Sequence, residues 1–179
     1  MSNFVVDSYR FAAAEDLCQL LTSNYAMVGY SNTRERVGVK LQSGSTWIGK
    51  TIDAVKFFLM WGDDGTGTVY ARVYRDGTTD PIITFGSKAI QTINKAASEN
   101  SYACGVCNWE EVTFTGGGSY TLLENDIICV VNDNGAGAPS LFTEPYFDAV
   151  PNGLLQMRYS SDSWSEATGE SLKMCIEEA

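Results

Sequence analysis

The chain has 179 residues, of which 44% are hydrophobic and 12% aromatic, so it can form one packed domain and is not disordered as a whole. Its 12 lysines and arginines against 22 aspartates and glutamates give a formal net charge of −10, which disfavours binding to nucleic acid or to anionic membranes. The sequence contains no histidine, which excludes Ser-His and Cys-His mechanisms and histidine-ligated metals within this chain.

The first residues, 1–7, lack the basic start and the long apolar run of a secretory signal. No stretch of about 18 apolar residues occurs anywhere in the sequence. The sequence therefore predicts no signal peptide and no membrane insertion. A chain of this kind is either kept in the cytosol or reaches the outside by another route, for example in a virus particle.

The segment 11–21 is rich in alanine and leucine and nearly free of β-branched residues, with its apolar side chains at helical spacing. This pattern predicts a short N-terminal helix. Near Asn24 the sequence changes from this helical spacing to short alternating runs of apolar and polar residues. This change divides the chain into an N-terminal arm or helix at 1–24 and a jelly-roll β domain at 25–179. The arm would serve either as a lid over one sheet edge or as a contact to a neighbouring subunit.

From residue 25 onward, short runs alternate apolar and polar side chains, which is typical of antiparallel strands. We expect strands at 36–41, 52–61, 68–74, 82–85, 111–115, 127–131, 155–159 and 172–176. Turn residues separate them at 62–67, 75–77, 116–118, 132–135 and 151–153. The pattern predicts an all-β fold, a two-sheet antiparallel jelly-roll sandwich with a short N-terminal helix or arm.

Two of these runs also predict which side chains face the core. In 52–61 one face carries Val55, Phe57, Leu59 and Trp61. In 68–74 the inward residues are Val69, Ala71 and Val73, and the outward ones are Tyr70, Arg72 and Tyr74.

The order of these runs resembles jelly-roll modules of the carbohydrate-binding and galactose-binding-like type, which occur in cell-surface proteins and in structural proteins of viruses. The matching stretches are RVGVKL at 36–41, the hairpin sequence at 47–74, the run at 109–131 and the C-terminal run at 161–178. Where such modules often have glycine in a turn, this chain has Asn125, which tolerates the same left-handed conformation. The resemblance implies a binding or assembly module and names no ligand.

The five cysteines leave at least one unpaired within the chain. Cys104 and Cys107 form a C-x-x-C pair, but no βαβ context for a redox site is predicted around it. With Cys129 and Cys175 the pair would supply four thiolates for zinc, although the second two lack the usual spacing. A zinc site, a disulfide and free thiols all stay open, with free thiols favoured.

Acidic turns provide oxygen atoms that calcium would accept as ligands. The candidate metal ligands are Asp63, Asp64, Asp126 and Asp133. Calcium needs six to eight oxygens gathered from several segments, and neither turn reproduces an EF-hand loop. The resemblance implies a structural calcium, whereas turn chemistry alone explains these residues without one. We expect no cofactor apart from this candidate calcium.

Exposed aromatic rings would stack on sugars or anchor a protein partner. Trp109 and Trp164 lie beside polar and acidic residues near expected strand starts, and Tyr159 lies on a nearby expected strand. These three are the candidate ligand- or partner-binding residues. The alternative is that such rings fill the core.

No catalytic constellation is evident, since neighbouring carboxylates such as Glu110 and Glu111 point to opposite faces of an expected strand. The leading hypothesis is a non-enzymatic structural or adhesion module of a virion or extracellular surface. It would form a homo-oligomer and contact glycans or other virion or surface proteins. The alternatives are a carbohydrate-binding module acting through exposed aromatics, and a small carboxylate-dependent hydrolase.

Overall fold

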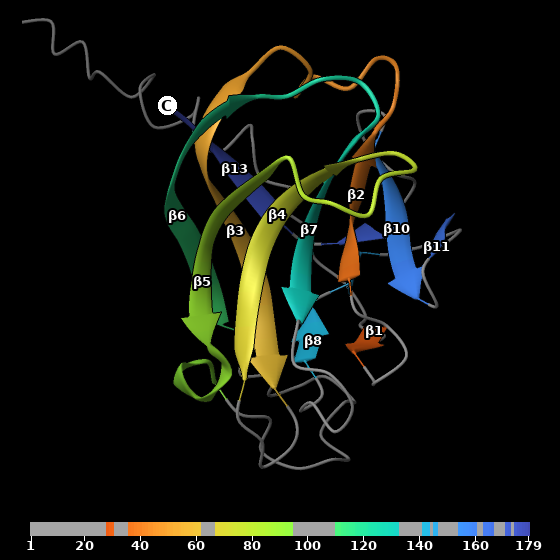
Figure 1. Cartoon of the computed structure of the whole chain (residues 1–179). Helices are drawn as coiled ribbons and strands as arrows, with labels where there is room; N and C mark the ends of the chain where they lie inside the picture. The colour runs from red at the N-terminus through yellow and green to blue at the C-terminus, as the bar shows by residue number, and fades with distance from the viewer. Residues whose placement is uncertain are drawn as a thin grey trace, which may run out of the picture.

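The computed structural model describes residues 28–30, 36–61, 67–94, 110–132, 141–143, 145–146, 154–160, 163–166, 171–172 and 174–179. These residues form strands and one short 3-10 turn, η1, as Figure 1 shows. In chain order the elements are β1 (Val28–Tyr30), β2 (Arg36–Leu41), β3 (Thr51–Trp61), β4 (Thr68–Arg75), β5 (Ile83–Ala89), η1 (Ile90–Thr92), β6 (Glu110–Thr121), β7 (Asp126–Asn132), β8 (Leu141–Thr143), β9 (Pro145–Tyr146), β10 (Leu154–Ser160), β11 (Ser163–Glu166), β12 (Ser171–Leu172) and β13 (Met174–Glu178).

Two antiparallel sheets pack against each other. The six-stranded sheet has the order β11-β10-β2-β7-β4-β5. In the five-stranded sheet, β6 pairs with one edge of β3, β13 and β8 pair with the other edge, and β1 pairs with β8. From β1 to β8 the chain crosses from one sheet to the other after β1, β2, β3, β5, β6 and β7. The predicted two-sheet antiparallel β-sandwich is confirmed.

The core lies between the sheets and is built from the predicted alternation. Val55, Phe57 and Leu59 of β3 are fully buried, and the rings of Phe57 and Phe114 meet edge to face with centroids 6.1 Å apart. The inward residues of β2 and β4 join the same cluster: Val37, Val39, Leu41, Val69, Ala71 and Val73. Period-two spacing therefore predicted the buried faces of β3 and β4 correctly at these positions, while the side chain of Trp61 lies outside the described residues.

The glycine run 116–118 was expected to be a turn, and this expectation is wrong because β6 continues through it to Thr121. The β3–β6 register shifts between Ile52 and Ala54, so the glycines form a bulge opposite Asp53. A Cβ added to Gly86 of β5 would lie 2.7 Å from the carbonyl oxygen of Thr115, and one added to Gly117 would overlap the carbonyl oxygen of Thr84. The two edge strands therefore approach closely along one side of the sandwich.

The expected helix at 11–21 and the whole arm at 1–24 lie outside the described residues. The division of the chain at residue 24 stays a prediction for the same reason. In the part of the chain that the structure covers, no helix is long and apolar enough to cross a membrane.

Candidate functional site

The outer face of the six-stranded sheet carries a second apolar cluster. All seven residues of β7 are buried, because Ile128 and Val130 face the core while Ile127, Cys129 and Val131 face outward into this second cluster. The cluster contains Tyr74, Ile127, Cys129, Val131 and Met157, with Tyr70 and Trp164 packed against it. The outward orientation of Tyr70, Arg72 and Tyr74 is confirmed, but Tyr74 is fully buried there.

Trp164, a predicted ligand-binding ring, lies on β11 over this cluster. Its ring meets Tyr74 edge to face with centroids 5.6 Å apart, and its Nε1 donates to the carbonyl oxygen of Thr78 at 3.0 Å. The Arg36 guanidinium lies 4.5 Å from the Tyr74 ring centroid and donates to the carbonyl oxygen of Thr79 at 2.9 Å. Trp164 and Arg36 thus hold the β4–β5 loop against the sheet, and Trp164 is half-buried.

Tyr159 pairs with Trp164 in the β10–β11 register, so the structure places these two predicted residues side by side on the sheet. The side chain of Tyr159 and the whole of Trp109 lie outside the described residues. Of the predicted aromatic site, the structure therefore describes one side chain, and that one makes structural contacts.

Asp126, a predicted calcium ligand, is fully buried at the start of β7. Its Oδ1 accepts hydrogen bonds from Arg75 Nε at 3.2 Å and Nη2 at 3.0 Å. Its Oδ2 accepts from the Tyr120 hydroxyl at 2.9 Å and the Leu123 backbone N–H at 2.8 Å. Because hydrogen-bond donors occupy both oxygens, a cation would have to displace them, and the carboxylate acts as a structural anchor.

The other candidate calcium ligands, Asp63, Asp64 and Asp133, lie outside the described residues. Among the residues that are described, no three histidine, cysteine, aspartate or glutamate side chains group closely enough to hold a metal ion. The calcium site stays a prediction.

The outer face of the five-stranded sheet carries an ion triad that sequence reasoning missed. Lys56 Nζ lies 2.7 Å from Glu177 Oε1 on β13 and 3.3 Å from Glu111 Oε1 on β6. The hydrogen bond to Glu177 raises the pKa of Lys56, and Glu111 adds to the effect. Only the strand register brings these residues together, so no short motif could have revealed them.

The two described cysteines, Cys129 and Cys175, lie on opposite outer faces of the sandwich. Cys175 on β13 is disulfide-bonded, and its partner lies outside the described residues. Cys129 is a buried free thiol whose Sγ donates to the Arg72 carbonyl oxygen at 3.6 Å, and burial raises its pKa. The predicted zinc site needed the thiolates of both Cys129 and Cys175. This prediction is wrong, because Cys175 is disulfide-bonded and Cys129 lies on the outer face of the other sheet.

Two hollows flank β6. One, of about 340 Å³, lies between the end of β5, η1 and the start of β6, and its lining is Lys88, Thr92, Ile93, Glu110, Glu111, Val112 and Thr113. The other, of about 400 Å³, lies at the glycine bulge and is lined by Asp53, Thr115, Gly116, Gly118, Ser119 and Ala179. We call the first the η1 groove. Sequence reasoning missed both, because each depends on how two strand edges meet.

Comparison with known protein families, curated proteins and solved structures found no match for this chain.

Proposed function

We propose that this chain is a non-enzymatic structural or adhesion module of a virion or cell surface, and that it works as a homo-oligomer. The observation that carries the proposal is the disulfide at Cys175. Disulfides persist in oxidising surroundings and are rare in the cytosol, so a small β-sandwich that contains one fits the outside of a cell or a particle.

The polar groups of the sandwich give further support. The buried carboxylate of Asp126 is fully engaged by donors from β4, β6 and the β6–β7 turn. The Lys56 triad likewise joins three strands. These groups stabilise the fold and are not held ready to react, as a stable surface module requires.

The experiment is to purify the full chain without reductant and to measure its mass by light scattering over a range of concentrations, with electron microscopy of the same samples. We expect discrete oligomers, filaments or shells. A monodisperse monomer at the highest attainable concentration would contradict the assembly part of the proposal. Reduction of the Cys175 disulfide at the redox poise of the cytosol would contradict the surface location.

A further inference from the structure

The hydroxyl group of Tyr74 is buried and makes no hydrogen bond to the described residues. Tyr74 points outward from β4 into the second apolar cluster, where its side chain is fully buried. Within the part of the chain that the structure describes, its hydroxyl oxygen has no hydrogen-bond partner. Buried hydroxyls in folded proteins are normally paired with protein groups, ordered water or ions. The Tyr74 hydroxyl therefore needs an acceptor that the described residues do not supply.

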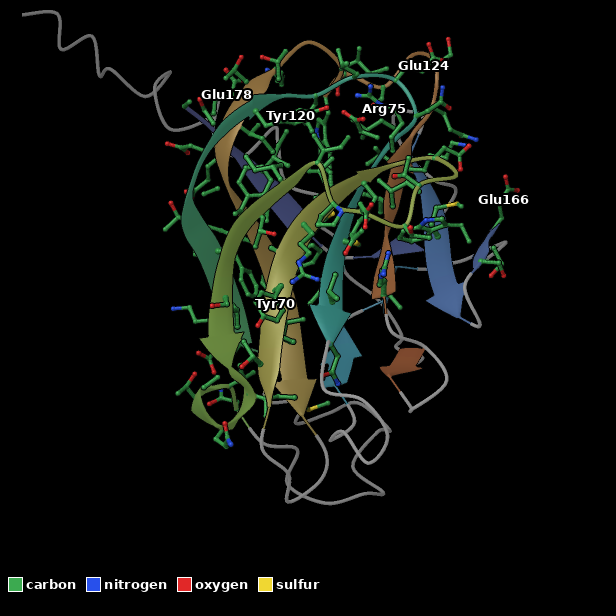
Figure 2. The ribbon with its side chains drawn as sticks, in the orientation of Figure 1. Tyr70, Arg75, Tyr120, Glu124, Glu166 and Glu178 are labelled. Atoms are coloured by element: carbon green, nitrogen blue, oxygen red, sulfur yellow. The ribbon has the colours of Figure 1, made fainter. Side chains whose placement is uncertain are left out.

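Two positive charges lie close to this hydroxyl. The Arg36 guanidinium lies 4.5 Å from the centroid of the Tyr74 ring. Arg72, two residues before Tyr74 on the outer face of β4, lies 4.3 Å from the ring centroid of Tyr70, which Figure 2 labels. Burial raises the pKa of Tyr74, and the charges of Arg36 and Arg72 act against this rise. They act in the same way on the buried thiol of Cys129, so both guanidinium groups lie near the phenol and the thiol.

The backbone carbonyl oxygens around this cluster already accept hydrogen bonds from its side chains. Three are used in this way: that of Thr79 by Arg36, that of Thr78 by Trp164, and that of Arg72 by the thiol of Cys129. A water molecule at the Tyr74 hydroxyl would need acceptors for its own two hydrogens, whereas an anion only accepts. Surroundings that consist of donors and carry two positive charges therefore favour an anion over water.

The cover over the cluster limits the size of such an anion. Cys129 and Val131 are fully buried beneath it, and Trp164 and Arg36 hold the β4–β5 loop against the sheet. A ligand with a carbon skeleton would have to displace this loop, whereas a monatomic anion needs little more room than a water molecule. The carboxylates on this side are directed elsewhere, since Asp76 pairs with Lys40 and Glu166 is exposed on the edge strand β11.

From this arrangement we infer that a halide ion, chloride in its usual form, binds on the outer face of the six-stranded sheet beneath the β4–β5 loop. The Tyr74 hydroxyl donates a hydrogen bond to the ion, and the positive charges of Arg36 and Arg72 offset the cost of burying it. Both arginines make other interactions as well, so the inference rests on the hydroxyl of Tyr74. It is independent of the proposed function, because it assigns an ion to the fold itself.

The first test is thermal unfolding of the full chain, purified without reductant, while chloride replaces the bulkier gluconate at constant ionic strength. We expect the Tm to rise saturably, by about 4 °C at ten times the dissociation constant of chloride. Tyr74→Phe keeps a ring beside Arg36 but removes the donor, so the rise should fall below about 1 °C. The matched control Lys88→Gln removes an exposed positive charge from the η1 groove and should keep the full rise.

The second test uses the unaltered chain and therefore decides the matter even if Tyr74→Phe does not fold. Crystals grown in bromide should give an anomalous signal within hydrogen-bond distance of the Tyr74 hydroxyl oxygen. A water molecule at that position without a bromide signal, or bromide at the surface only, would overturn the inference. So would an equal chloride dependence in the wild type and Tyr74→Phe. Loss of the rise in Lys88→Gln would also overturn it, because chloride would then act only on the net charge of the chain.

Discussion

Arg75 and Asp126 are direct partners in the β4–β7 register, and their side chains also form an ion pair with each other. The guanidinium, 45% exposed, reaches the fully buried carboxylate with two nitrogen atoms. Arg75 Nη2 also donates to the Tyr120 hydroxyl oxygen at 3.0 Å. One carboxylate thus joins the end of β4, the end of β6 and the start of β7, as the labelled Arg75 and Tyr120 in Figure 2 illustrate.

Asp126→Asn should destabilise the fold by about 3 kcal/mol, because an amide cannot accept at both positions and leaves buried donors unpaired. Urea unfolding followed by tryptophan fluorescence measures the change. Glu124→Gln is the matched control, since Glu124 lies exposed in the same turn and its loss should change the stability by less than about 0.5 kcal/mol. Equal effects of the two substitutions would contradict the anchoring role of Asp126.

Much of the sandwich could be predicted because its strands alternate. The spacing of Val55, Phe57 and Leu59 alone predicts a buried face. Asn125 predicts a left-handed turn, and the structure has this turn with a φ of 69° at Asn125. The contacts between strands could not be predicted in this way. Lys56 is far in sequence from Glu111 and Glu177, and only the register brings them together.

The prediction of a turn at the glycine run 116–118 was wrong for a related reason. Composition marks 116–118 as a turn, whereas the structure uses Gly117 to let β6 approach β5. The requirement comes from a neighbouring strand and not from the local chain. For the candidate site, the aromatic pattern identified Trp164 as a ring at the surface, but its engagement with Tyr74 and Thr78 depends on a loop folded over the sheet.

Gly117→Ala should destabilise the chain by about 1–3 kcal/mol, because the new methyl group meets the Thr84 carbonyl and must push β5 and β6 apart. Thermal unfolding reports the loss. Gly44→Ala offers a comparison in open space, where nothing lies within 4 Å and the cost comes from φ of 88° alone, about 1 kcal/mol. If Gly117→Ala is as stable as the wild type, the close approach of the two strands is refuted.

The two described cysteines should differ in reactivity. Burial raises the pKa of Cys129, so its thiol should resist iodoacetamide in the native protein and react only after unfolding. Cys175 should react only after reduction, and Cys175→Ser should lower the stability by about 2–5 kcal/mol. Peptide mapping by mass spectrometry reads both sites. Labelling of Cys175 in unreduced, unfolded protein would show that the disulfide is absent.

Trp164→Phe keeps a ring against Tyr74 but removes the hydrogen bond to Thr78, so it should cost about 1 kcal/mol. Trp164→Ala removes the ring as well and should cost more, about 2–3 kcal/mol for a half-buried aromatic. Denaturant unfolding of the two variants measures this difference. Equal stability of both with the wild type would mean that Trp164 makes no structural contribution and would revive its role as a ligand-binding ring.

Alkaline pH should weaken the fold through Tyr120. Burial raises the pKa of Tyr120 above its ordinary value of 10.0, and the hydrogen bond to Asp126 raises it further. The folded state therefore holds the Tyr120 proton more tightly than the unfolded state does. The stability that this group adds to the fold is complete below about pH 10, and it is lost as the pH rises through the pKa of Tyr120 in the folded state. Burial acts in the same direction on Tyr74, and the hydrogen bond to Glu177 does so for Lys56.

Urea midpoints measured between neutral pH and about pH 11.5 should thus fall steeply above about pH 10. Tyr120→Phe should start lower at neutral pH, because Asp126 loses a donor, but should then fall less with rising pH, because no phenol ionises at this position. The difference between the two curves isolates the contribution of Tyr120 from those of Tyr74 and Lys56. Parallel curves for wild type and variant would refute the coupling between the Tyr120 proton and the buried carboxylate.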